Sequence, residues 1–193
     1  MAQQNTAARI AAAALRILEH EGPEAVSMRR VAKAVGITPM AIYHHFPNRQ
    51  ALLKTITDRE FETLAQYIDI RRPRGPTESR LLQVMDYYLN YAFARPRVFD
   101  YVFSQSRTGA RRFPDDFRAR RSPTMNRVAD TVAGAMRAGE IRKDDVWEVA
   151  LELWALIHGY IALYRAGRFA LSEEQFRQLC RRSLRRLLHG LKR

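Results

Sequence analysis

The chain has 193 residues, and 47% of them are hydrophobic, so it can bury a substantial core and does not have the composition of a disordered protein. Its 33 Lys and Arg residues outnumber its 20 Asp and Glu residues, and the formal net charge of +13 favours a nucleic acid or another polyanion as a partner. The single cysteine, Cys180, excludes an intrachain disulfide and fits a reducing compartment, so we expect a cytoplasmic protein.

The first two predicted elements are amphipathic helices. One is expected from Thr6 to about Gly22, because its apolar residues recur at the spacing of one helical face. The other is expected over 28–35, where Ser27 can cap the first turn and Gly36 can adopt the positive φ that ends a helix.

A short third helix is predicted directly after them. Thr38 can cap it, and Pro39 suits its first turn because no amide proton is needed there. Ile42 and Phe46 are expected to point inward. Two short helices joined by a tight turn with glycine are typical of a helix-turn-helix, whose second helix enters the major groove of DNA.

The rest of the chain is also predicted to be helical. Asn48 can cap a long helix that runs to about Ile70, and the segment 71–76, which has two prolines and a glycine, predicts a boundary. Further helices are expected from Thr77, from Pro96, over 123–138, over 145–166 with Asp144 as its cap, and after Ser172 as a cap. No strand-like alternation is visible in the sequence, so the expected fold is all-α with about nine helices.

The run Val-Gly-Ile-Thr-Pro-Met-Ala-Ile-Tyr-His-His-Phe-Pro-Asn-Arg-Gln-Ala-Leu-Leu, residues 35–53, resembles the signature of TetR-type transcriptional regulators. That signature has a turn Gly, a Ser or Thr cap, Tyr-x-His/Tyr-Phe, and then a Lys and a Leu. Arg49 departs from it, since the family usually has Lys there, and Arg and Lys differ in hydrogen-bonding geometry. Trp-Ala-Leu-Ile-His-Gly, residues 154–159, resembles a Trp-x-x-x-His-Gly signature found in one branch of the family.

The resemblance implies a division of the chain by function. Residues 1–54 would form a three-helix DNA-binding domain, a helix at about 48–70 would link it onward, and residues 71–193 would form a ligand-binding and dimerisation domain. Seven basic residues against three acidic ones in 1–54 predict an affinity for DNA that falls with salt. The residues expected at the DNA are Arg29, Thr38, Pro39, Met40, Ala41, Tyr43, His44 and Arg49.

The start of the third helix also predicts a mode of base recognition. Pro39, Met40 and Ala41 cannot form bidentate hydrogen bonds with bases. We therefore expect this helix to recognise thymine methyl groups and DNA shape.

Most aromatic residues lie in the second half, where the resemblance implies a pocket for a small apolar or aromatic effector. The alternative is an ordinary core, because aromatic residues at helical spacing usually pack against one another. The candidate ligand-binding residues are Tyr88, Tyr91, Phe99, Phe103, Trp154 and His158. For His158 a backbone carbonyl or a carboxylate is slightly favoured over a ligand as the hydrogen-bond partner.

The last two predicted helices are the candidate dimer interface, because a two-fold dimer doubles the contacts of a helix-turn-helix with a palindromic operator. The candidate interface residues are Leu156, Tyr160, Phe176, Leu179, Leu184 and Leu187. The arginines on the other face of the last helix, Arg177, Arg181, Arg182, Arg185 and Arg186, are expected to be solvated. The apolar run 146–164 is expected to be a core helix and not a membrane span, since carboxylates interrupt it.

These features predict a homodimeric regulator, with a repressor favoured over an activator, that binds a palindromic operator in double-stranded DNA and is released by a small molecule. No nucleophile elbow, dinucleotide fingerprint or metal-ligand cluster is visible, so we expect no enzyme activity, cofactor or metal. Two alternatives stay open: a DNA-binding protein without a small-molecule switch, controlled by a protein partner or acting architecturally, and a helical ligand-binding protein or enzyme that has lost operator recognition.

Overall fold

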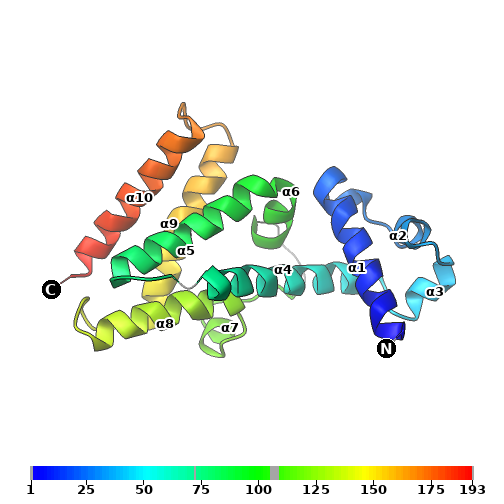
Figure 1. The fold of residues 1–193 in the computed structure, drawn as a ribbon, viewed down its shortest axis with the longest axis horizontal. Helices are drawn as coiled ribbons and strands as arrows, with labels where there is room; N and C mark the ends of the chain where they lie inside the picture. Colours follow the sequence, from blue (N-terminus) through cyan, green and yellow to red (C-terminus); the bar gives the residue numbers. More distant parts are fainter. Residues whose placement is uncertain (1, 72, 105–108, 193) are drawn as a thin grey trace. The chain divides into compact units, whose positions relative to one another are not determined.

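The computed structural model of the chain describes residues 2–71, 73–104 and 109–192. The regular structure of these residues is helical throughout, with no strand, which confirms the all-α prediction (Figure 1). In chain order the elements are α1 (Ala2–Glu21), the 3₁₀ turn η1 (Pro23–Ala25), α2 (Met28–Val35), α3 (Pro39–Tyr43), α4 (Arg49–Arg71), α5 (Thr77–Ala94), α6 (Pro96–Phe99), the π-helical turn η2 (Asp100–Ser104), α7 (Asp115–Arg118), α8 (Pro123–Arg137), α9 (Val146–Arg165) and α10 (Glu173–Gly190).

The chain packs into two compact units. The N-terminal unit comprises Met1–Thr63 and Phe93–Ala110, and the C-terminal unit comprises Leu64–Ala92 and Arg111–Arg193. Helices α4 and α5 therefore each contribute residues to both units. This division by compactness differs from the expected functional division at residues 54 and 71, which stays a prediction.

Local hydrogen bonds explain where the helices of the helix-turn-helix begin. The Ser27 Oγ accepts a hydrogen bond from the Arg30 amide at 3.2 Å, and the Thr38 Oγ1 accepts one from the Ala41 amide at 3.2 Å. Between them Gly36 has a φ of 77°, a left-handed conformation that a residue with a Cβ rarely adopts. These predicted capping and turn roles are confirmed.

Apolar side chains from three helices close the N-terminal unit. Helix α1 contributes Ile10 and Leu18, α2 contributes Val31, and α3 contributes Ile42, all with no exposed surface. Phe46, which follows α3, is also buried. Burial of Ile42 and Phe46 confirms the expected inward face of the third helix.

Two helix starts differ from the sequence expectation. Helix α1 begins at Ala2, four residues before Thr6. Asp145, not Asp144, caps α9: its Oδ1 accepts hydrogen bonds from the amides of Trp147 at 2.8 Å and Glu148 at 3.1 Å. Because a capping side chain must reach the second or third amide of the helix, Asp144 lies one residue too early.

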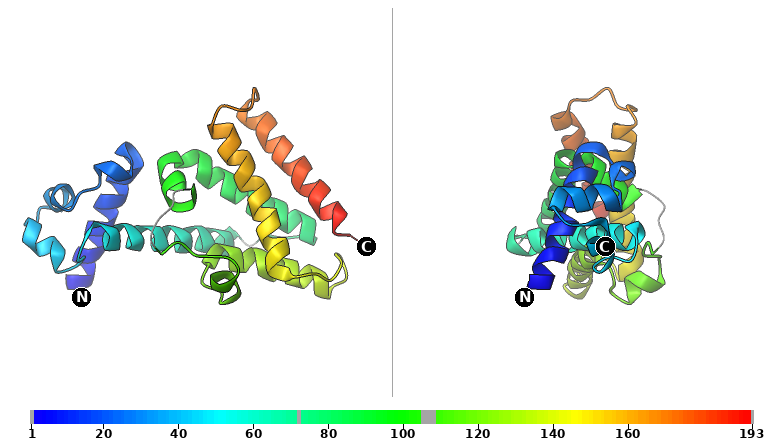
Figure 2. Two further views of the ribbon diagram at one scale, coloured as in Figure 1. Left: turned by 180° about the vertical axis from the view of Figure 1, so that it is seen from behind. Right: turned by 90° about the vertical axis from the view of Figure 1, so that its right-hand side faces the viewer.

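The C-terminal unit is built on α9, which packs against α8 and α10. Figure 2 shows α10 beside the later part of α9, near the loop that joins the two helices, and the helices spread apart away from that loop. Ile161 of α9 and Phe176 and Leu184 of α10 are fully or almost fully buried between these elements. Cys180 is buried with them, and this burial raises the pKa of its thiol to about 12.

Part of the arginine face of α10 pairs with α5 and is not simply solvated. Arg181 forms an ion pair with Asp86 at 2.5 Å, and Arg185 forms one with Glu78 at 3.3 Å. Arg177 donates a hydrogen bond to Asn90 at 2.9 Å. Arg185 is exposed, as expected for a solvated face, whereas Arg177 and Arg181 are half-buried because the helix opposite them presents complementary acceptors.

Arg95 joins three segments of the N-terminal unit. It follows α5, and its guanidinium forms ion pairs with Glu60 of α4 at 2.6 Å and with Glu19 of α1 at 2.9 Å. The Glu60 side chain is only 4% exposed. A buried carboxylate needs compensation, so Arg95 fixes the spacing of these segments.

We expect Arg95→Ala to lower the free energy of unfolding by about 3 kcal/mol, because Glu60 loses its guanidinium partner while staying buried. Urea denaturation followed by circular dichroism measures this change. Arg97→Ala is the matched control, since Arg97 is exposed and forms no ion pair among the described residues. A loss of the same size in both variants would contradict the role given to Arg95.

Candidate functional site

The exposed surface of α3 carries most of the predicted DNA-contacting residues. Met40 is 72% exposed and Tyr43 is 50% exposed, so two large side chains of one short helix face solvent. Thr38, Pro39 and His44 are exposed beside them, so one turn presents all five side chains to solvent. Such a surface is suited to contacting a macromolecule.

Two further predicted DNA-contacting residues, Ala41 and Arg29, differ from each other in exposure. Ala41 is half-buried, and only part of its methyl group is accessible. Arg29 is exposed in the first turn of α2, as a phosphate contact requires.

Arg49 has a structural environment that the sequence did not reveal. Its Nε donates to the Val26 carbonyl at 2.7 Å, and its Nη2 donates to the Pro23 carbonyl at 2.5 Å. The side chain therefore fastens the start of α4 to the turn before α2. A lysine has one ammonium group and cannot reproduce this fork, which gives a physical reason for arginine at this position. Its expected phosphate contact stays a prediction.

Arg9 holds α2 in position, a role that the sequence did not reveal. The Arg9 Nη2 of α1 donates to the carbonyl of Val35 at the end of α2, at 3.0 Å. The only signal in the sequence was a basic residue on an apolar helix. A separation of 26 residues gave no indication of its partner.

Three of the candidate ligand-binding residues meet in the C-terminal unit. The Tyr88 hydroxyl accepts a hydrogen bond from the Trp154 Nε1 at 3.1 Å and lies 3.0 Å from the His158 Nδ1. Burial raises the pKa of Tyr88, so its hydroxyl keeps a proton that it can donate to His158. The Trp154 and His158 rings lie 5.1 Å apart between centroids. The result is a small polar network with aromatic walls, in which a phenol hydroxyl bonds His158.

The other candidates have different surroundings. Phe99 and Phe103 belong to the N-terminal unit, where their ring centroids lie 5.1 Å apart and Phe103 also packs against Phe61 at 5.0 Å. Tyr91 is half-buried in the C-terminal unit. Phe99 is only 1% exposed, so it packs as a core residue.

The candidate dimer residues separate into two groups. Phe176 and Leu184 are buried in the core of their own unit, and the ring of Phe176 lies 4.3 Å from that of Tyr164. Neither offers surface to a second chain. The half-buried candidates are Leu156, Tyr160, Leu179 and Leu187. Their contact with a partner stays a prediction.

Helix α9 is long and apolar enough to cross a membrane by length and composition alone, but only 28% of its most apolar stretch is buried within the chain. Leu163 is 47% exposed on this helix. A single such helix is weak evidence for a membrane span, and a partly uncovered apolar helix equally fits a protein interface.

We expect Tyr88→Phe to lower the free energy of unfolding by about 1–2 kcal/mol, because it leaves the half-buried Trp154 Nε1 without its acceptor. Urea unfolding monitored by tryptophan fluorescence measures the change. Tyr87→Phe, which removes a hydroxyl from the neighbouring position, is the control. Equal effects of the two substitutions would argue against the network.

Comparison with known proteins agrees with this geometry. A family model described as bacterial regulatory proteins of the tetR family matches residues 10–56, and one described as a tetracyclin repressor-like C-terminal domain matches residues 81–187. The chain is 31% identical over 163 residues to the HTH-type transcriptional repressor KstR of Mycolicibacterium smegmatis, covering 79% of this chain and 78% of the relative.

Solved structures share the fold over nearly the whole chain. A protein of unknown function from Rhodococcus sp. RHA1 has a TM-score of 0.81 at 22% identity, with 97% of this chain and 96% of that chain covered. The flavonoid-responsive regulator FrrA has a TM-score of 0.65 at 25% identity, with 97% of each chain covered. With an exposed helix-turn-helix followed by a matching C-terminal domain, the chain belongs to the TetR family of DNA-binding transcriptional regulators.

Proposed function

We propose that the protein is a homodimeric repressor that binds a palindromic operator and is released by a small apolar or aromatic effector. The observation that carries the proposal is the exposed turn of α3, where Met40 and Tyr43 are held outward by the burial of Ile42. The relative KstR is named as a repressor, which supports the sign of regulation. A regulator of this kind acts in the cytoplasm.

Base recognition in this proposal is largely apolar. The thymine C5 methyl lies in the major groove, and an exposed thioether such as that of Met40 can contact it. In this proposal the exposed Tyr43 and His44 contact phosphates or a further methyl group. Arg29 and the other basic residues of the N-terminal unit supply the sequence-independent attraction to phosphates.

Dimerisation in this proposal uses α9 and α10. Their uncovered apolar surface includes Leu163 and the half-buried Leu156 and Tyr160. Covering this surface with a second copy removes apolar area from water on both chains. A two-fold dimer would set the two copies of α3 about 34–36 Å apart, one helical turn of DNA, or a multiple of that distance.

The effector in this proposal binds beside the network of Tyr88, Trp154 and His158. Aromatic walls with a few polar groups suit an apolar or aromatic molecule. FrrA is named as responsive to flavonoids, which are aromatic, and this supports the effector class. Release requires that the effector bind the DNA-free arrangement of the dimer more tightly than the DNA-bound one.

We expect Met40→Ala to weaken binding to a palindrome from the gene's own upstream region by about tenfold, or about 1.4 kcal/mol, because a methyl contact is lost. Fluorescence anisotropy with a labelled duplex measures the affinity. Ile70→Ala is the control, since Ile70 is also apolar and 76% exposed but lies in the C-terminal unit. The same loss should follow replacement of a contacted thymine by uracil. Unchanged binding in both tests would contradict methyl recognition.

We expect the protein to sediment as a dimer at micromolar concentration and Leu163→Glu to shift it toward a monomer, because a carboxylate would be buried at the interface. Analytical ultracentrifugation reports both states. Ile70→Glu, the same change at an exposed apolar residue outside α9 and α10, should leave the dimer intact. A monomeric wild-type protein would overturn the dimer proposal.

A further inference from the structure

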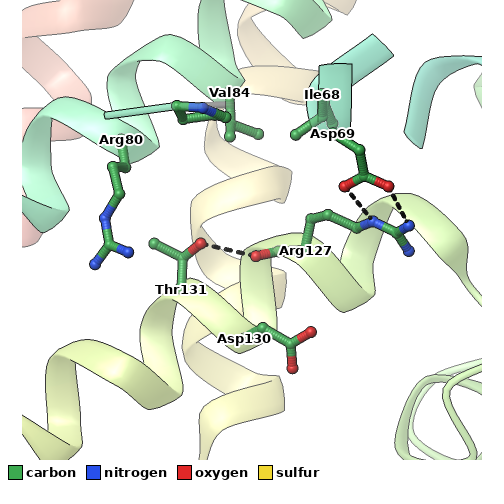
Figure 3. A pocket seen from close by; sticks show the side chains of 8 residues that line it. Ile68, Asp69, Arg80, Val84, Arg127, Asp130 and Thr131 are labelled. Carbon is green, nitrogen blue, oxygen red and sulfur yellow. Dashed lines mark hydrogen bonds and ion pairs between the residues drawn. The ribbon is translucent and has the colours of Figure 1, made fainter. Parts of the chain in front are cut away.

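A polar hollow of about 550 Å³ opens on the C-terminal unit, apart from the network of Tyr88. It lies between the end of α4, the start of α5 and the middle of α8 (Figure 3). Its lining residues are Ile68, Asp69, Pro73, Arg80, Val84, Arg127, Asp130 and Thr131.

Both carboxylates in the hollow already have arginine partners. Asp69 is bound by Arg127 through two hydrogen bonds of 3.1 and 2.6 Å. Asp130 is bound by Arg120 in the same forked manner, at 3.0 and 2.8 Å. The hydrogen bonds from Arg127 also lower the pKa of Asp69, so this carboxylate stays ionised and paired at neutral pH.

Arg80 is the remaining cation of the hollow. Its Nη2 donates to the Thr77 Oγ1 at 3.0 Å, while its Nε is buried without a hydrogen-bond partner. No carboxylate forms an ion pair with Arg80 within the described part of the chain. Figure 3 shows Arg80 across the hollow from the pair formed by Asp69 and Arg127. The fold thus neutralises both carboxylates and leaves one guanidinium uncompensated.

The chemistry of this site selects an anion of single charge. A planar guanidinium matches a carboxylate in geometry and forms charge-assisted hydrogen bonds with it. The lining itself holds Arg80, Arg127, Asp69 and Asp130. Arg120, which lies outside the lining, pairs with Asp130, so that three guanidinium groups meet two carboxylates and one positive charge is in excess, which a monoanion balances and a phosphate dianion exceeds. The buried Ile68 and the half-buried Val84 provide an apolar wall beside it.

We infer that the hollow binds a small monocarboxylate, with its carboxylate on Arg80 and its apolar part against Ile68 and Val84. The claim that this carboxylate is the charged end of the effector rests on the proposed function. The claim that the hollow binds a carboxylate does not depend on it. Val84 and Tyr88 lie one turn apart on α5 and so share a face of that helix.

The test is a series of carboxylates, acetate, hexanoate and benzoate, each paired with its neutral amide, added to full-length protein without DNA. Isothermal titration calorimetry and thermal shift should show at least one carboxylate binding about tenfold more tightly than its amide. Arg80→Gln should weaken that binding by about tenfold or more. Arg137→Gln removes the same charge from an exposed position outside the hollow and should leave it unchanged.

Three results would overturn the site: amides that bind as well as carboxylates, unchanged affinity in Arg80→Gln, or inorganic phosphate bound more tightly than any carboxylate. If Arg80→Gln does not fold, Arg80→Lys keeps the charge and assigns the Nε resonance of Arg80 by its disappearance. That resonance should shift in wild-type protein on adding the carboxylate, and an unshifted resonance would overturn the site.

Measuring operator binding in the presence of the carboxylate distinguishes a failure of this inference from a failure of the proposed function. A carboxylate that binds the free protein but does not weaken operator binding leaves the site intact and refutes its role as effector. A protein that binds no operator refutes the proposed function, while carboxylate binding remains measurable on the DNA-free chain.

Discussion

The candidate DNA-binding surface of the protein depends on the packing of Ile42 into the core of the N-terminal unit. Helix α3 has five residues, far fewer than a helix needs to be stable in isolation. Its conformation is therefore imposed by its surroundings: Ile42 fits a closed apolar core, Thr38 caps its start, and Arg49 fastens the chain that follows. Met40 and Tyr43 are exposed because Ile42, on the same short helix, faces the core.

Helix boundaries could be predicted from the sequence where a local capping hydrogen bond sets them. Ser27, Thr38 and Asn48 each accept a hydrogen bond from an amide three residues later, as their side chains and spacing predicted. Asp145 shows the limit of this approach, because two adjacent aspartates both satisfy the pattern and only the backbone decides between them. The all-α fold followed from periodicity, since apolar residues recur at helical spacing and no strand-like alternation is visible in the sequence.

Contacts between distant residues could not be predicted. Tyr88 and His158 are 70 positions apart, so the sequence suggested a polar partner for the histidine but not a phenol. The partners of Arg177 and Arg181 were not evident because they lie on α5, about 90 residues earlier, in a helix whose own pattern was dominated by apolar residues. For the same reason, some candidate dimer residues are buried within their own chain and others are partly exposed. A row of leucines on one face of a helix does not indicate whether a helix of the same chain or of a second copy packs against it.

The buried thiol of Cys180 has a practical consequence for testing the proposed dimer and its release from DNA. A thiol whose pKa is raised to about 12 and which has no exposed surface is a poor nucleophile toward maleimides or methanethiosulfonates. A cysteine introduced at an exposed position would therefore be the single reactive site in each copy, with no need to replace the native one. Spin labels attached in this way would report the separation of two copies by pulsed electron resonance, with and without DNA.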